Sequence, residues 1–99
     1  MKKNNTTLAE VISYLEDIIE TRSTSLEDTY TANLLKKSIA RISQKVGEEA
    51  VEVVIAANLK DKKQTIAESA DLLFHLMVLW KKLGVKEEDV AKELSRRKK

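Results

Sequence analysis

Two groups of acidic residues stand out in this sequence, because each lies in a segment that is otherwise rich in apolar residues. The first group is Glu48, Glu49 and Glu52, and the second is Glu68 and Asp71. In a helix, the first three share a sector about 100° wide, and Glu68 and Asp71 lie on one stripe. The other faces of both segments are apolar, so we expect both helices to be buried. Because buried carboxylates need cationic partners, the acids are expected to face a cleft where they meet cations.

A divalent cation is the partner that suits such a cluster. Two carboxylate pairs on facing helices, Glu49 with Glu52 and Glu68 with Asp71, supply only oxygen ligands. Oxygen ligation favours Mg²⁺, with Mn²⁺ as an alternative, over zinc, and helical bundles often hold metals between carboxylates spaced in this way. The chain has no cysteine and one histidine, His75, which excludes thiolate sites and a di-iron site. We expect His75 to be a packed residue bonded to Asp71.

The alternative interpretation is that these acids form a solvated stripe. In that case they would pair with lysines such as Lys45, Lys60 and Lys81, as charged stripes on amphipathic helices commonly do. The protein would then be a helical interaction module without enzymatic activity. Composition alone does not separate this interpretation from a metal site.

The elements that position the acids are expected to be helices throughout a single domain spanning residues 1–99. The chain has no proline, two glycines and four aromatic residues, which disfavours an all-β fold. Apolar spacing and capping residues predict an all-α fold of about five helices. The first expected helix is Leu8 to Ile19, after a cap at Thr6 or Thr7, and Thr21 to Thr29 is expected to be a loop. The next helices are expected at about Thr31 to Ser43 and at Gln44 to Leu59. The last two are Asp61 to about Leu83, ended by Gly84, and Glu87 to Arg97. Gly47 either loosens a junction or lies in a continuous helix where something packs closely.

Charge and hydropathy restrict the partners of the protein. A net charge of +2 with 34% charged residues does not indicate nucleic-acid binding. No apolar run reaches the roughly 18 residues of a membrane span, and the start MKKNNTT is unlike a signal peptide. We expect a cytoplasmic protein with no nucleic-acid or membrane partner. Because the run Leu72 to Trp80 is apolar on nearly every side, we also expect a homodimer or a dimer of dimers.

The two acidic motifs resemble a known family signature. EEAVE (Glu48 to Glu52) and ESAD (Glu68 to Asp71) are similar to the E-E-x-x-E and E-x-x-D motifs of the all-α nucleotide pyrophosphohydrolases, which include MazG and the dimeric dUTPases. The flanking sequences Tyr30-Thr31, QKVGEEAVEVVIAA and ESADLLFHLMVLW look like those of the phosphoribosyl-ATP pyrophosphatases of histidine biosynthesis. This resemblance extends over about Leu8 to Arg97. Many members have a Gly-Pro pair where this chain has Lys37-Ser38-Ile39, so we expect a straighter, longer second helix here.

The resemblance implies a fold, a reaction and a set of site residues. The fold is a MazG-like bundle completed by dimerisation. Many bacteria fuse this domain to a zinc-dependent cyclohydrolase domain, and because 99 residues without cysteine leave no room for the second activity, we expect the stand-alone form. The reaction is Mg²⁺-dependent hydrolysis of 1-(5-phosphoribosyl)-ATP, a small-molecule nucleotide, to 1-(5-phosphoribosyl)-AMP and pyrophosphate, the second step of L-histidine biosynthesis. The implied residues are Glu49, Glu52, Glu68 and Asp71 as metal ligands, and Tyr30 and Thr31 near the substrate. Glu48, at the edge of the same helix face, is expected to be a catalytic residue that orients the attacking water or holds a second metal. Lys45, one turn earlier on that face, is a candidate to contact the phosphates of the substrate.

Two questions stay open at this point. Lys45 could contact phosphate or form an ion pair with Glu49, and Lys36, Lys37 and Arg41 are further phosphate candidates whose simpler interpretation is solvated surface. A house-cleaning (d)NTP pyrophosphatase of the same superfamily would use the same metal chemistry on another nucleotide.

Overall fold

The computed structural model describes residues 6–97, and these form five α-helices and no strand. The helices are α1 (Leu8–Ser23), α2 (Tyr30–Leu35), α3 (Ile39–Asn58), α4 (Lys62–Leu83) and α5 (Glu87–Arg97). The expected all-α class with five helices is confirmed. Most of the start MKKNNTT, which was compared with a signal peptide, lies outside the described residues. Along residues 6–97, no helix is both long enough and apolar enough to cross a membrane.

Several helix ends follow the capping residues of the sequence. Thr7 and Glu10 form a reciprocal capping box at the start of α1, with both hydrogen bonds at 3.2 Å. The Asp61 carboxylate accepts a hydrogen bond from the Gln64 N–H at 3.0 Å and caps α4. Gly84 ends α4 in the left-handed conformation, with φ 73°. At its other end α1 continues to Ser23, past the predicted start of the loop.

The prediction of a long second helix from Thr31 to Ser43 is wrong. Helix α2 ends at Leu35, and α3 begins at Ile39, earlier than the expected Gln44. The cause is Ser38, whose backbone is extended and whose hydroxyl accepts a hydrogen bond from the Arg41 N–H at 3.2 Å. A serine cap therefore breaks the helix without a Gly-Pro pair. Gly47 lies inside the continuous helix α3, as the second alternative proposed, but it has open space beside it and nothing in this chain packs closely against it.

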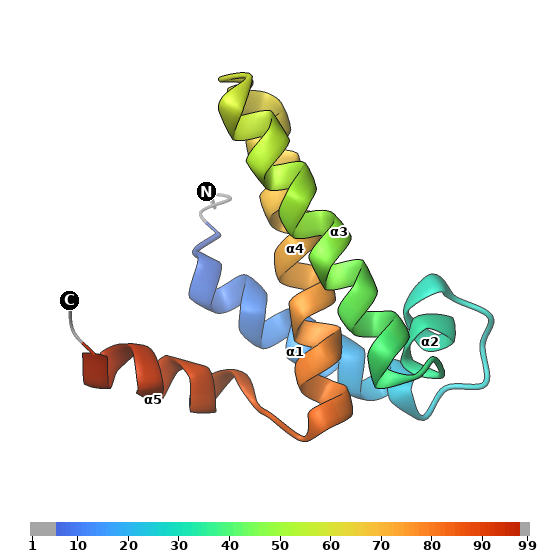
Figure 1. The fold of residues 1–99 in the computed structure, drawn as a ribbon. Coiled ribbons are helices and arrows are strands. Elements are labelled where there is room, and N and C mark those ends of the chain that lie inside the picture. The colour runs from blue at the N-terminus through green and yellow to red at the C-terminus, as the bar shows by residue number, and fades with distance from the viewer. Residues whose placement is uncertain (1–5, 98–99) are drawn as a thin grey trace, which may run out of the picture.

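Helices α3 and α4 form a long antiparallel hairpin that projects from the rest of the chain (Figure 1). At its turn, Lys60 is left-handed with φ 58°, and the Asp61 N–H donates to the Ala56 carbonyl at 3.1 Å. Helices α1 and α2 pack near the opposite end of the hairpin. The radius of gyration is 14.8 Å, against about 13 Å for a compact chain of this length. Both the hairpin and α5 extend away from the core (Figure 1).

The hydrophobic core lies where α1 and α2 meet the hairpin. It comprises Ile19, Leu34, Leu35, Ile42, Met77 and Val78. The apolar run Leu72 to Trp80 of α4 is at least partly buried against this core. The middle of α4, which was expected to be exposed in a single chain, is therefore covered, and the exposed apolar side chains lie on other parts of the chain.

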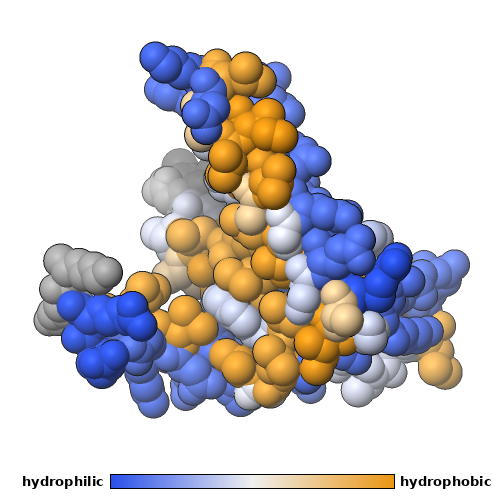
Figure 2. Space-filling view, in the orientation of Figure 1, coloured by the Kyte–Doolittle hydropathy of each residue, from blue (hydrophilic) through white to orange (hydrophobic). Residues whose placement is uncertain are grey.

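Part of that uncovered surface is the outer part of the hairpin, shown as the orange region above the base of the molecule in Figure 2. We call it the hairpin patch, and it consists of Val51, Val54, Ile55, Leu59 and Ile66, each more than half exposed. The expectation that α3 is buried outside its acidic sector is therefore wrong for a single chain. Its physical reason is that α1 and α2 do not reach this end of the hairpin.

Candidate metal centre

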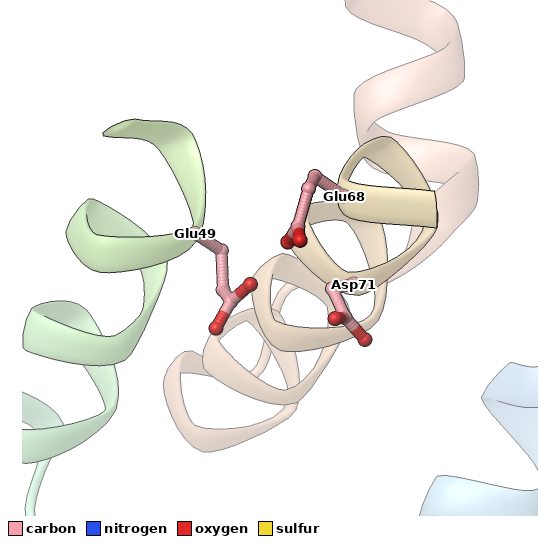
Figure 3. A group of neighbouring side chains, drawn as sticks. All are labelled: Glu49, Glu68 and Asp71. Carbon is pink, nitrogen blue, oxygen red and sulfur yellow. The ribbon is translucent and has the colours of Figure 1, made fainter. Parts of the chain in front are cut away.

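Three acidic side chains converge from the two helices of the hairpin. Glu49 of α3 faces Glu68 and Asp71 of α4 (Figure 3). One carboxylate oxygen of each lies within 4.8 Å of the others. We call these three residues the acid cluster. It supplies a set of oxygen donors that is dense enough to hold one cation.

The register of the hairpin explains why these acids meet. Glu52 and Glu68 each lie eight residues from Lys60, and Glu49 and Asp71 each lie eleven residues from it. Both helices rise by about 1.5 Å per residue, so equal distances from the turn place Glu49 across from Asp71 and Glu52 across from Glu68. The acidic motifs are thus symmetric about the turn.

The acid cluster carries more negative charge than its surroundings compensate. The Glu49 side chain is only 12% exposed, and Glu68 is half-buried. Partial burial raises the pKa of Glu68, and the charges of Glu52, Glu49 and Asp71 raise it further. In the part of the chain that the structure describes, neither Glu68 nor Asp71 forms an ion pair through its side chain. An added cation would relieve this repulsion.

The two remaining predicted acids lie beside the acid cluster. Glu52 is exposed and lines a shallow pocket with Glu68, whose pKa it raises. Glu48 is 52% exposed and accepts a hydrogen bond from Gln44 Nε2 at 3.1 Å. The structure thus brings together three of the four predicted ligands, with Glu52 adjacent and Glu48 turned toward α2. The roles assigned to these residues stay predictions.

The lysines of the solvated-stripe alternative behave differently from one another. Lys45 Nζ lies 3.6 Å from Glu49 Oε2 and 4.0 Å from Glu48 Oε1, so the ion pair with Glu49, one of the two alternatives for Lys45, is present. Such a pair contributes only about 0.3 kcal/mol and leaves Lys45 free to contact a phosphate. Lys81 instead pairs with Glu20 of α1. One lysine beside Glu49 does not neutralise the acid cluster.

A buried histidine connects the acid cluster to α2. His75 is 5% exposed, and its Nδ1 lies 2.8 Å from the main-chain carbonyl of Asp71. Because a carbonyl only accepts, Nδ1 carries a proton, and in the neutral ring Nε2 accepts from the Tyr30 hydroxyl at 2.8 Å. The expected bond between His75 and Asp71 is therefore confirmed, through the main chain. Its contact with Tyr30 spans 45 positions and has no signal in the sequence.

Tyr30 also forms part of an open groove between α2 and the first half of α3. The groove has a volume of about 230 Å³ and is lined by Lys37, Arg41, Lys45 and Glu48, among others. Predicted substrate residues Tyr30 and Lys45 therefore share one concave surface, and Thr31 is half-buried next to Tyr30. Sequence reasoning considered Lys37 and Arg41 only as weak phosphate candidates, because the break at Ser38 that shapes this groove was not predicted.

Comparisons with protein families and with curated proteins both find relatives of this chain. The family model described as phosphoribosyl-ATP pyrophosphohydrolase matches residues 11–98 of the chain. A curated protein of Zymomonas mobilis subsp. mobilis, named phosphoribosyl-ATP pyrophosphatase, is 51% identical over 89 residues, which are 89% of this chain and 83% of that protein. Both matches include the whole acid cluster and the groove.

Proposed function

The chain belongs to the phosphoribosyl-ATP pyrophosphohydrolase family, and from this we propose that it hydrolyses 1-(5-phosphoribosyl)-ATP to 1-(5-phosphoribosyl)-AMP and pyrophosphate. It is a hydrolase of a pyrophosphate bond that acts in histidine biosynthesis. The observation that carries this assignment is a match over nearly the whole chain, 51% identical to the curated relative.

The acid cluster is the proposed site of a Mg²⁺ ion, and Mn²⁺ would suit the same donors. Its three oxygen donors lie within 4.8 Å of one another. Hard cations prefer carboxylate oxygens as ligands, and a bound cation would offset the excess negative charge of this cluster. Glu49, Glu68 and Asp71 would hold the ion, with Glu52 as a further ligand. When bound, such a cation offsets charge on a polyphosphate and lowers the pKa of a bound water.

The side chains around the acid cluster would position the substrate. A triphosphate is repelled by carboxylates unless cations lie between them, and Lys45 stands 3.6 Å from Glu49, where its ammonium group can contact phosphate oxygens. Glu48, on the neighbouring position of α3, is proposed to orient the attacking water. Tyr30 and Thr31 would contact the substrate from α2.

A pyrophosphate-release assay with Mg²⁺ tests the reaction and the site together. Wild-type protein should release pyrophosphate from phosphoribosyl-ATP much faster than from ATP, dUTP or dCTP. If ATP, dUTP or dCTP released pyrophosphate as fast as phosphoribosyl-ATP does, the enzyme would not be specific for phosphoribosyl-ATP and the proposed substrate would be wrong. Glu68→Gln and Asp71→Asn should each abolish turnover without unfolding the protein, because they keep the volume and lose the charge. Glu88→Gln, on the exposed first turn of α5, is the control and should be as active as wild type.

We also propose that the protein self-associates through the hairpin patch. Five apolar side chains more than half exposed on one projecting element are typical of a surface that is covered in the assembled protein, and a two-fold contact is the commonest way to cover it. Light scattering should give a mass of at least twice 11.2 kDa. Ile55→Asp should reduce this mass, while Leu26→Asp, at a loop residue that is 98% exposed, should not. A monomeric wild type would contradict the proposal.

A further inference from the structure

The groove between α2 and α3 differs in charge from the acid cluster beside it. Its charged lining residues are Lys37, Arg41, Lys45 and Glu48, so three cationic groups face one anionic group. At about 230 Å³ it is smaller than the roughly 300–1,000 Å³ of sites that enclose a drug-sized ligand. The groove therefore suits one anionic end of a larger molecule.

Two of the basic residues and Glu49 of the acid cluster follow one stripe of α3. Arg41, Lys45 and Glu49 recur at intervals of four residues, which keeps them near the same face, and Lys37 lies just before the helix and lines the same groove. Along this face the charge changes from positive at the start of α3 to negative at Glu49, over about 12 Å between Arg41 and Glu49. A ligand that lies along the stripe meets a cationic site at one end and a metal-binding site at the other.

Two of the cations have no partner in the protein itself. Among residues 6–97, the side chains of Lys37 and Arg41 form no ion pair and no hydrogen bond, whereas Lys45 lies near both Glu48 and Glu49. Glu48 is in turn engaged by Gln44. The wall opposite is held in place, because the Tyr30 hydroxyl is bonded to buried His75. The groove thus has a fixed wall and two cationic side chains, Lys37 and Arg41, that are available to bind an anion.

We propose that this groove binds the phosphate monoester of the substrate, the 5′-phosphate of its phosphoribosyl group. This inference rests on the proposed function, in which the substrate has a triphosphate at one end and a phosphate monoester at the other. The triphosphate lies at the acid cluster, and the monoester lies at Lys37 and Arg41. An arginine can bind a phosphate through two parallel hydrogen bonds, so Arg41 contributes most of the recognition.

Binding of product fragments tests this assignment, measured by calorimetry on the full chain with Mg²⁺. Phosphoribosyl-AMP carries the 5′-phosphate of the phosphoribosyl group in addition to the 5′-phosphate of its adenosine, whereas AMP carries only the adenosine 5′-phosphate. Pyrophosphate represents the leaving group at the triphosphate end of the substrate. Arg41→Ala should weaken phosphoribosyl-AMP binding at least tenfold, since a charged hydrogen bond is lost, and should leave the affinities for AMP and pyrophosphate unchanged. Lys37→Ala should act in the same direction. Lys92→Ala, at an exposed lysine of α5 that does not line the groove, is the control and should change none of them.

The outcomes separate this inference from the proposed function. If Arg41→Ala weakens pyrophosphate or AMP as much as phosphoribosyl-AMP, the groove holds the other end of the substrate and the inference is wrong. Unchanged phosphoribosyl-AMP binding in both variants also overturns it. A wild-type protein that fails to release pyrophosphate from phosphoribosyl-ATP would refute the proposed function instead.

Discussion

Removing the Tyr30 hydroxyl should destabilise the fold by more than the high exposure of this side chain suggests. Tyr30 is 57% exposed, whereas its partner His75 is 5% exposed and bonded to it at 2.8 Å. In Tyr30→Phe the ring stays, together with its packing on Phe74 at a centroid distance of 6.4 Å, and only the hydrogen bond is lost. The buried Nε2 of His75 is then left without a donor.

The expected cost follows from that unsatisfied nitrogen. Leaving a buried acceptor without its partner costs about 1–3 kcal/mol. For a domain of this size, each kcal/mol lowers Tm by roughly 4–8 °C. Tyr30→Phe should therefore lower Tm by at least about 4 °C in thermal denaturation. In urea, the unfolding midpoint should fall with no change in the m-value.

Two comparisons make this prediction refutable. Tyr14→Phe removes a hydroxyl that is 64% exposed and forms no hydrogen bond within residues 6–97, so its effect should be small. In a His75→Leu background, Tyr30→Phe should cost much less than in wild type, because the two residues are coupled. If Tyr30→Phe costs no more than Tyr14→Phe, the bond does not stabilise the protein, and the rigid wall assigned to the groove is wrong.

Three further perturbations have expected outcomes. Mg²⁺ should raise Tm with a dependence on concentration typical of binding to the folded state, and a metal-free wild type as stable as the Mg²⁺-loaded protein would contradict this. Glu68→Gln should raise the metal-free Tm, because the raised pKa of Glu68 means that its charged form opposes folding. A Glu68→Gln protein that melts no higher than metal-free wild type would contradict the second expectation. Glu20→Gln should lower the free energy of unfolding at neutral pH, since a hydrogen bond from Lys81 and the charge of Lys81 hold the pKa of Glu20 below its ordinary value of 4.5. In urea titrations, the difference between variant and wild type should disappear as the pH falls through that lowered pKa. Gly47→Ala should raise the free energy of unfolding by about 0.5–1 kcal/mol, because the helix has open space there; a loss of stability would show that a second chain packs against Gly47.

Local signals in the sequence were sufficient for most of the helices. The capping box of Thr7 and Glu10, the Asp61 cap and the left-handed Gly84 all depend on residues within one turn of each other, so they are readable without a structure. Ser38 carried a signal of the same kind, but the absence of a Gly-Pro pair at this place favoured a continuous helix. The serine alone was enough to end it.

The site was predictable only where it depends on helical periodicity. Glu49, Glu68 and Asp71 were placed together from their positions on two helices, and the structure brings them together. The bond between Tyr30 and His75 joins residues 45 positions apart, for which periodicity gives no information. A helical wheel likewise shows that Val54 is apolar, but not whether it is covered by the same chain or by another.

The symmetry of the acids about Lys60 also affects how the chain folds. The turn between α3 and α4 involves only residues 59–61, and closing so short a loop costs little chain entropy. Such local contacts are expected to form early, so the two acidic motifs meet as the hairpin closes. Their mutual repulsion opposes this closure. A divalent cation in the refolding buffer should therefore accelerate folding as well as stabilise the folded protein.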